Sequence, residues 1–155
     1  MVRPCFMSFQ SHIIAIGKMK SSSPFRVAYE EYNKRLKGSI ELSELDGKTT
    51  ADEHTKIQAK LNPQAPIIAL DELGKTLSSQ ELSKKIGDLQ QIKSGKVQFI
   101  IGGADGLSNE IRNQADLVLS FGRLTWPHML ARVMLIEQIY RAGLIMNNHP
   151  YHREG

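Results

Sequence analysis

Hydrophobic and polar residues along the chain follow two periods in turn, and this alternation predicts five strands separated by helices. Short apolar runs bounded by glycine, proline or charged residues are typical of buried strands. Such runs lie at 12–18, 39–45, 66–72, 97–101 and 116–121. Between them the apolar residues recur every three or four positions, which is the period of an amphipathic helix.

Local signals predict where the helices begin. Ser23 followed by Pro24 predicts the start of the first helix. Ser78 and Glu81 form a capping-box pattern for a third helix, and Ser108 is expected to cap a short fourth one. Apolar residues at helical spacing predict one buried stripe on the first helix and one on the third: Phe25, Ala28, Tyr29, Tyr32 and Leu36, and then Leu82, Ile86, Leu89 and Ile92.

Two further segments complete the pattern of strands and helices. Residues 49–61 predict a polar helix with few core anchors, and a long apolar helix is expected from Pro127. The last helix is more apolar around its circumference than one sheet face requires, which favours a surface shared with a second subunit. The order of elements predicts a single α/β domain with a mostly parallel sheet and helices on both faces.

The net charge, the cysteine content and the length of the apolar runs indicate which kinds of partner and which compartment fit the protein. Twenty Lys and Arg against sixteen Asp and Glu give a formal net charge of +4, which suits a polyanion such as RNA. The single cysteine, Cys5, cannot form an internal disulfide and fits a reducing compartment, so a cytoplasmic protein is expected. Since no apolar run reaches 18 residues, no membrane association is expected.

Parallel sheets bind ligands at the carboxyl ends of their strands, so the loops after the third, fourth and fifth strands are the candidate sites. The sequence DELGKTLSS contains GKT, but Ala69 stands where a P-loop needs its first glycine. Here LGK is expected to form a turn, and Asp71 and Glu72 are expected to be loop charges. In FIIGGADGLSNE three glycines would let the backbone approach a ligand, and Asp105 disfavours phosphate.

The segment SFGRLTWPH carries the only tryptophan of the chain, next to backbone groups that could recognise a purine edge. Taken alone, Trp126 is more often a core residue and His128 an exposed residue of a first helical turn. The five histidines lack the spacing of a metal site, so no metal is expected. The chain also lacks the G-x-S-x-G pattern of a serine hydrolase.

Several of these segments together carry a resemblance to a known family. The segments IIAIGKMK, ALDELGKTLSS, FIIGGADGL, LSFGRLTWPHMLARVMLIEQIYRA and HPYHR, in this order, closely resemble the ribosomal RNA large-subunit methyltransferase H family, a small SPOUT-class enzyme. The resemblance covers about His12 to Arg153. It implies a C-terminal trefoil knot, a homodimer and S-adenosylmethionine as cofactor. It also implies methylation of N3 of a pseudouridine in helix 69 of 23S rRNA, on the assembled 70S ribosome.

The resemblance also assigns residues to the expected site. It implies cofactor contacts at these positions: Leu70, Gly102, Phe121, Gly122, Arg123, Leu124, Thr125 and Trp126. It places the catalytic group at His128 and in the C-terminal signature, Tyr151, His152 and Arg153. Residues 1–11 precede the family's first strand and are expected to form an N-terminal extension, with the methyltransferase domain at 12–155.

The chemistry of the reaction leaves two alternatives open. His152 is favoured as the base that removes the N3 proton, ahead of His128, because imidazole has the side-chain pKa nearest neutrality. Desolvation of the substrate and hydrogen bonds from Arg153 could instead stabilise the deprotonated base. Lys18, Lys20, Arg26 and Arg35 are expected either to contact RNA or to form a solvated basic face.

Two function classes compete with an rRNA methyltransferase. One is a nucleotide-binding or flavodoxin-like α/β module, which the order of elements and the glycine loop also fit. The other is a non-catalytic ribosome-binding factor with the same fold.

Overall fold

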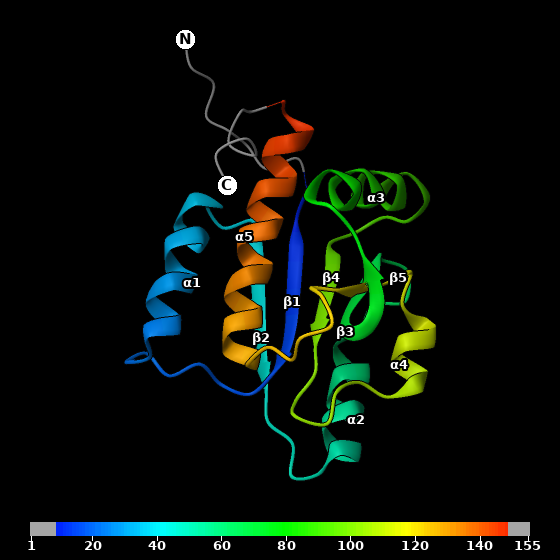
Figure 1. Ribbon diagram of the computed structural model, residues 1–155. Helices are drawn as coiled ribbons and strands as arrows, with labels where there is room; N and C mark the ends of the chain where they lie inside the picture. The colour runs from blue at the N-terminus through cyan, green and yellow to red at the C-terminus, as the bar shows by residue number, and fades with distance from the viewer. Residues whose placement is uncertain (1–8, 149–155) are drawn as a thin grey trace.

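The predicted order of elements is confirmed by the computed structural model, which describes residues 9–148 (Figure 1). The elements are β1 (Ser11–Ile16), α1 (Pro24–Arg35), β2 (Ile40–Leu45), α2 (Thr50–Lys60), β3 (Ile67–Thr76), α3 (Ser79–Ile92), β4 (Val97–Ile101), α4 (Asn109–Gln114), β5 (Leu117–Ser120) and α5 (His128–Met146). Within the described part of the chain, no helix is both long and apolar enough to span a bilayer.

The five strands form one sheet in the order β2-β1-β4-β3-β5, and all of their pairings are parallel. The carboxyl ends of β1 and β4 therefore meet, with Ala15 opposite Ile101. On the next strand Leu70 pairs with the same Ile101. The loops that follow β1, β3 and β4 thus lie together at one edge of the sheet.

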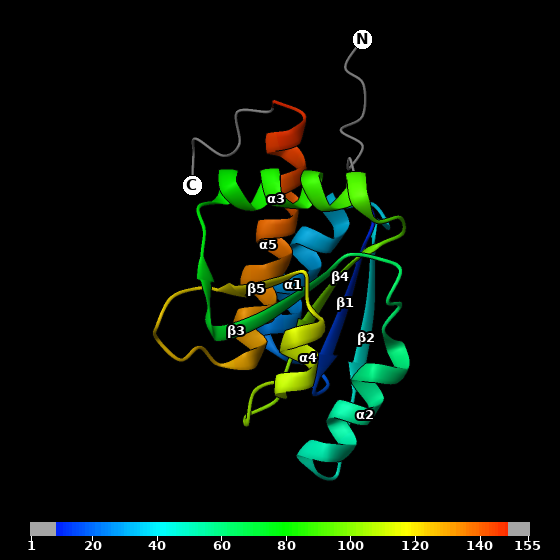
Figure 2. The same ribbon diagram turned by 90° about the vertical axis from the view of Figure 1, so that its right-hand side faces the viewer.

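Side chains that alternate along the strands divide the core between the two faces of the sheet. Ile13 and Ala15 belong to a core cluster with residues of α1, α3 and α5, whereas Ile14 and Ile16 pack with residues of α2 and α4. Figures 1 and 2 show these helices on opposite sides of the sheet. The result is the three-layer α/β architecture that the sequence predicts.

The helix starts are confirmed, but two expected core positions are wrong. Ser78 and Glu81 form both hydrogen bonds of a capping box, and Ser23 and Ser108 cap α1 and α4. Ile92 is 78% exposed and Phe25 is 36% exposed, although both follow the buried spacing. Each lies at a helix end, where the helix no longer lies over the core.

The end of β3 also differs from the expected turn at LGK. The strand continues to Thr76, and Leu119 of β5 pairs with both Leu70 and Lys75, so residues 71–74 form a bulge. A Cβ on Gly74 would lie 2.6 Å from the carbonyl oxygen of Val118. Only glycine therefore allows the two strands to approach this closely.

The described chain begins close to the core. The side chain of Phe9 is 3% exposed, and the carbonyl of Gln10 accepts a hydrogen bond from the Val97 amide. Residues 1–8 of the expected extension lie outside the described residues. So do residues 149–155, which include the predicted site residues Tyr151, His152 and Arg153.

Candidate functional site

A cavity of about 420 Å³ lies at the carboxyl ends of β3 and β4, beside the loop that follows β5. Its wall is formed by the bulge of β3, the glycine loop after β4, the loop 121–127 and the first turn of α5. This is the sheet edge at which parallel α/β proteins bind ligands.

Most of the predicted cofactor residues line this cavity. Seven do so: Leu70, Gly102, Phe121, Gly122, Leu124, Thr125 and Trp126. The eighth, Arg123, is exposed and is not part of the wall. His128 lines the cavity from the first turn of α5 and is itself exposed. The structure thus brings together residues that are more than fifty positions apart in the chain.

The glycine loop after β4 is tightly folded upon itself. A Cβ on Gly102 would lie 2.9 Å from the carbonyl carbon and oxygen of Gly106, which has a φ of +73°. The Gly106 amide donates to the carbonyl of Gly103 at 3.0 Å, and Thr50 of α2 donates to Asp105 at 2.9 Å. Gly102 is therefore needed for the loop's own packing as well as for an open cavity wall.

The loop 121–127 is held by few contacts. Gly122 has a φ of +115°, and the Ser120 hydroxyl accepts a hydrogen bond from its amide at 3.1 Å. Thr125 approaches the carboxylate of Glu72 at 3.4 Å. Trp126 is 37% exposed on the cavity wall, so its interpretation as a core residue is wrong. Leu124 is 73% exposed at the same wall.

Carboxylates dominate the polar part of the cavity wall. Asp71, Glu72 and Asp105 line the cavity, and Arg112 is the one Lys or Arg that lines it among residues 9–148. Arg112 is paired with Asp71 at 3.1 Å, and the side chain of Asp71 is only 7% exposed. Since three negative groups face one paired positive group, the cavity favours a neutral or cationic ligand over an anionic one.

Sequence reasoning missed Asp71 and Arg112 as parts of this wall. Asp71 directly follows Leu70, but the expected turn made it a loop charge. Its position directly after the apolar part of the predicted strand 66–72 was the available signal. Arg112 carried no comparable signal, because its contact with Asp71 joins residues 41 positions apart.

The predicted RNA contacts of the first helix prove to be partly structural. Arg26 donates to Glu44 at 2.8 Å, and its side chain is 23% exposed. Arg35 is paired with Glu31 and stacks on the ring of Tyr32 at 5.3 Å. Lys18 is exposed and paired with Asp46, and Lys20 is exposed. The two lysines therefore remain candidates, whereas Arg26 has a role inside the fold.

A second groove, of about 540 Å³, lies between α3, α5 and the end of β5. Its lining includes half-buried apolar residues of α5, Val133 and Met134, together with Tyr32 and Leu77. No cluster of His, Cys, Asp and Glu suited to a metal ion occurs within residues 9–148.

The length of α5 separates its last residue, Met146, from the cavity. Figure 1 shows α5 beginning beside the carboxyl ends of the strands and ending at the opposite end of the sheet. At about 1.5 Å per residue, Met146 lies roughly 27 Å along the helix from His128. The described chain therefore ends far from the cavity, and the predicted site residues Tyr151, His152 and Arg153 lie outside the described residues.

Comparisons with known proteins agree with this architecture. A family model described as "Predicted SPOUT methyltransferase" matches residues 9–152. Proteins named ribosomal RNA large subunit methyltransferase H from Rhodospirillum centenum and Zymomonas mobilis are 43% and 44% identical to the chain. The alignments cover 91% and 93% of this chain, and 97% and 98% of those proteins.

A solved structure of a probable methylase family protein from Haemophilus influenzae has a similar fold. It aligns with a TM-score of 0.55 at 12% identity, over 92% of this chain and 70% of that chain. The family match, rather than this structural likeness, implies the C-terminal trefoil knot. The chain belongs to the SPOUT methyltransferase family and, within it, to the proteins named ribosomal RNA large subunit methyltransferase H.

Proposed function

We propose that the protein transfers a methyl group from S-adenosylmethionine to N3 of a pseudouridine in helix 69 of 23S rRNA, within the assembled 70S ribosome. The relatives named above are rRNA methyltransferases by name. The observation that carries the proposal is the cavity formed by Leu70, Gly102 and the loop 121–127. An enzyme with this substrate works in the cytoplasm.

The cavity suits S-adenosylmethionine in both shape and charge. The rings of Phe121 and Trp126 and the side chains of Leu70 and Leu124 offer an apolar surface for an adenine ring. S-adenosylmethionine carries a sulfonium and an ammonium group, and the carboxylates of the wall favour such positive charge. The same carboxylates disfavour the phosphates of a flavin or a nucleotide, which argues against the nucleotide-binding alternative.

In the proposed reaction the protein orients the cofactor and the substrate and manages one proton. When bound, S-adenosylmethionine supplies the methyl group: its bond to sulfur breaks as the bond to N3 forms, and the N3 proton is released. Orientation should account for much of the acceleration. His152 would accept the proton, and Arg153 would bind a phosphate or a base carbonyl. His128, at the cavity wall, is the alternative base.

The distance between the end of α5 and the cavity supports a homodimer with shared sites. Because the described chain ends far from its own cavity, we propose that His152 acts in the cavity of a second copy. The half-buried apolar residues of the second groove, among them Val133 and Met134, offer a surface for such a copy. Each active site would then combine the cavity of one subunit with Tyr151, His152 and Arg153 of the other.

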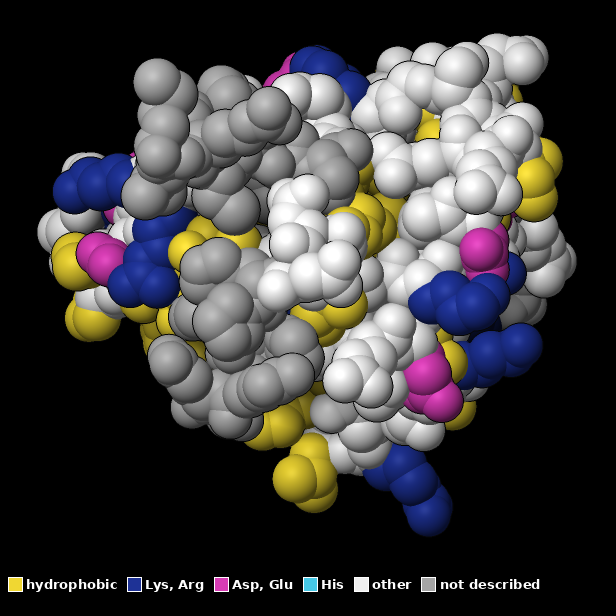
Figure 3. All heavy atoms as spheres, turned by 90° about the horizontal axis from the view of Figure 1, so that it is seen from above, with side chains coloured by type: hydrophobic (Ala, Val, Ile, Leu, Met, Phe, Trp, Pro, Cys, Tyr) yellow, Lys and Arg dark blue, Asp and Glu magenta, His cyan; other side chains and the backbone are white. Residues whose placement is uncertain are grey.

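Exposed basic residues near the cavity would contact the rRNA. Arg123 belongs to the loop 121–127 but does not line the cavity, and it forms no ion pair within residues 9–148. Its backbone would contribute to the cofactor site, while its side chain would reach a phosphate. Other Lys and Arg side chains lie away from the cavity, at the margins of the face where α5 ends (Figure 3).

Transfer of a labelled methyl group tests the proposed function. Ribosomes from a strain that lacks the modification are incubated with the protein and labelled S-adenosylmethionine, either as intact 70S particles or as separated subunits. The proposal predicts label in 23S rRNA and a clear preference for 70S particles. Binding to ribosomes with no transfer of label would favour the non-catalytic ribosome-binding factor.

A further inference from the structure

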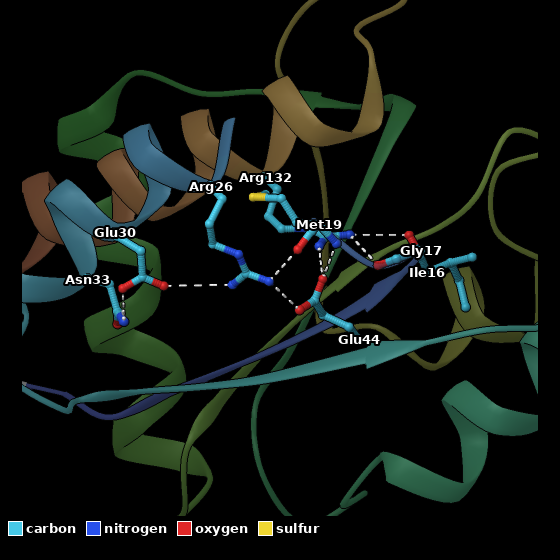
Figure 4. Close-up of polar contacts among 8 residues, drawn as sticks. All are labelled: Ile16, Gly17, Met19, Arg26, Glu30, Asn33, Glu44 and Arg132. Carbon is cyan, nitrogen blue, oxygen red and sulfur yellow. Dashed lines mark hydrogen bonds and ion pairs between the residues drawn. The ribbon is translucent and has the colours of Figure 1, made fainter. Parts of the chain in front are cut away.

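Arg132 is a charged residue buried completely in the core. Its side chain is 0% exposed, and it lies in the second turn of α5. Nη1 donates to the carboxylate of Glu44 at 2.9 Å, and Nη2 donates to the carbonyl oxygens of Gly17 at 3.0 Å and Ile16 at 3.2 Å (Figure 4). These contacts make the burial of a guanidinium possible, because a buried charge must be paired and hydrogen-bonded.

The contacts of Arg132 join three elements at the sheet edge that holds the cavity. Ile16 and Gly17 are the last residue of β1 and the residue after it, and Glu44 lies near the end of β2. Glu44 also accepts hydrogen bonds from Arg26 of α1 and from the Met19 amide (Figure 4). Arg132 therefore ties α5 directly to the carboxyl ends of β1 and β2.

The position of the first turn of α5 depends strongly on these hydrogen bonds of Arg132, because the helix lacks a side-chain N-cap. The N-cap residue is Pro127, which provides no side-chain hydrogen bond to the first turn. His128 and Ala131 line the cavity, and Arg132 is the next residue along the helix. Hydrogen bonds of Gln138 and Ala142 also join α5 to α3, but these two residues are farther along the helix from the cavity.

A contribution to the stability of the fold does not by itself explain why residue 132 is an arginine. Replacing a buried ion pair by well-packed apolar residues is often neutral or stabilising. The Nε atom of Arg132 is buried without a hydrogen-bond partner within the described chain, and so is the hydroxyl of the neighbouring helix's Tyr29. An apolar side chain at position 132 would avoid the unpaired Nε, but it could not donate hydrogen bonds to the carbonyls at the end of β1.

We propose that Arg132 is a positioning residue for the cofactor site: it fixes the first turn of α5 against the end of β1, and so sets where Trp126 and His128 stand at the cavity. This inference rests on the proposed function, in which the cavity binds S-adenosylmethionine. Arg132 touches neither the cofactor nor the substrate and acts through the residues that it holds in place.

The single tryptophan allows a direct test. Trp126 is the only tryptophan of the chain, so tryptophan emission, excited selectively over the four tyrosines, reports on the loop 121–127. In Arg132→Met we expect a shifted Trp126 emission without cofactor and a dissociation constant for S-adenosylmethionine raised about tenfold or more, since small misplacements at a site are costly. Calorimetry measures the affinity, and circular dichroism checks that the variant is folded.

Arg26→Met is the matched control. It removes the other arginine bonded to Glu44 but leaves the contacts with Ile16 and Gly17 intact, so emission and affinity should stay close to those of the wild-type protein. If Arg132→Met does not fold, Arg132→Lys is tested in its place. The lysine ammonium keeps the positive charge but cannot make all the hydrogen bonds of the planar guanidinium. Its emission and affinity should therefore lie between those of the wild-type protein and those expected for Arg132→Met.

The outcomes separate this inference from the proposed function. A folded Arg132→Met protein with wild-type emission and affinity would overturn the positioning role, as would an equal loss in Arg26→Met. If the wild-type protein does not bind S-adenosylmethionine, the proposed function fails. A shift of Trp126 emission confined to the Arg132 variants would even then support the positioning of the loop.

Discussion

Gly102 and Gly106 pack so closely at the end of β4 that a Cβ on Gly102 would lie 2.9 Å from the carbonyl of Gly106. The two residues fold the glycine loop back upon itself and leave its outer side as a wall of the cavity. A side chain at position 102 would therefore damage the loop before it met any ligand.

Substitution of Gly102 should remove cofactor binding at a moderate cost in stability. Gly102→Val and Gly102→Ala force the Gly106 backbone to move, with an expected loss of about 1–3 kcal/mol in the free energy of unfolding. Calorimetry should detect no binding of S-adenosylmethionine. Gly87 of α3 is the control, because a Cβ there meets nothing within 4 Å and alanine should stabilise the helix by about 0.5–1 kcal/mol. Normal binding by Gly102→Val would reject the proposed cavity wall.

Substitutions in the C-terminal segment should affect turnover rather than cofactor affinity. His152→Ala and Arg153→Ala each remove a group that is proposed to act on the substrate, and we expect turnover to fall about a hundredfold or more. The dissociation constant of S-adenosylmethionine should remain close to the wild-type value. A loss of affinity as large as the loss of turnover would instead place these residues in the cofactor site.

The pH dependence of turnover tests the choice of base. If an imidazole removes the N3 proton, turnover should fall as the pH drops below the ordinary histidine pKa of about 6.5. His152→Ala should abolish this dependence, and His128→Ala should keep it. The opposite pattern would assign the base to His128. A dependence unchanged in both variants would favour desolvation and Arg153.

Mixed dimers test whether the tail serves the second subunit. One subunit carries Gly102→Val and an intact tail, and the other carries His152→Ala and an intact cavity. If the tail acts in trans, each mixed dimer has one complete site of two. About half of the wild-type sites should then be active in mixed dimers purified through two tags, and about a quarter in an unseparated statistical mixture. Activity no greater than that of the two parent variants would show that the sites are not shared.

Glu44 should make stability depend on pH. Burial opposes its ionisation, but hydrogen bonds from the Met19 amide and Arg26, with the charges of Arg26 and Arg132, outweigh burial and lower the pKa of Glu44. A carboxylate with a lowered pKa stabilises the fold above its unfolded pKa of about 4.3, and this stabilisation is lost as the pH falls through the folded pKa. Glu44→Gln should thus cost about 3 kcal/mol at pH 7, since it leaves Arg132 buried without its partner charge.

Urea unfolding at a series of pH values measures this dependence. The difference between wild-type and Glu44→Gln proteins should shrink below about pH 4. Glu31→Gln is the control, because Glu31 is 59% exposed in its pair with Arg35 and should contribute less than about 0.5 kcal/mol. A constant difference across the pH range would mean that the charge of Glu44 is not what stabilises the fold.

The parts of the fold that depend on neighbouring residues were predictable from the sequence. Ser78 and Glu81 act within one helical turn, so their pattern suffices to identify the start of α3. The strands are short apolar runs, and their alternation with helices fixes a parallel sheet. The positions of Leu70, Gly102 and Trp126 around one cavity follow from that topology together with the family resemblance.

The features that depend on distant contacts were not predictable in this way. The bulge of β3 exists because Gly74 meets the backbone of Val118, 44 positions later in the chain. Arg132 is one of several charged residues of α5, and its partner Glu44 lies 88 residues away. Nothing in the sequence marks Arg132 as the buried one, because its partners come together only in the folded chain.

Identification of the modified nucleotide tests the central claim most directly. Unmodified 70S ribosomes are treated with the protein and S-adenosylmethionine, and fragments of 23S rRNA are then examined by mass spectrometry. We predict one added methyl group on a pseudouridine of helix 69, at N3, and none with the Gly102→Val variant. A methyl group at another position, or helix 69 left unmodified by the folded wild-type protein, would contradict this account.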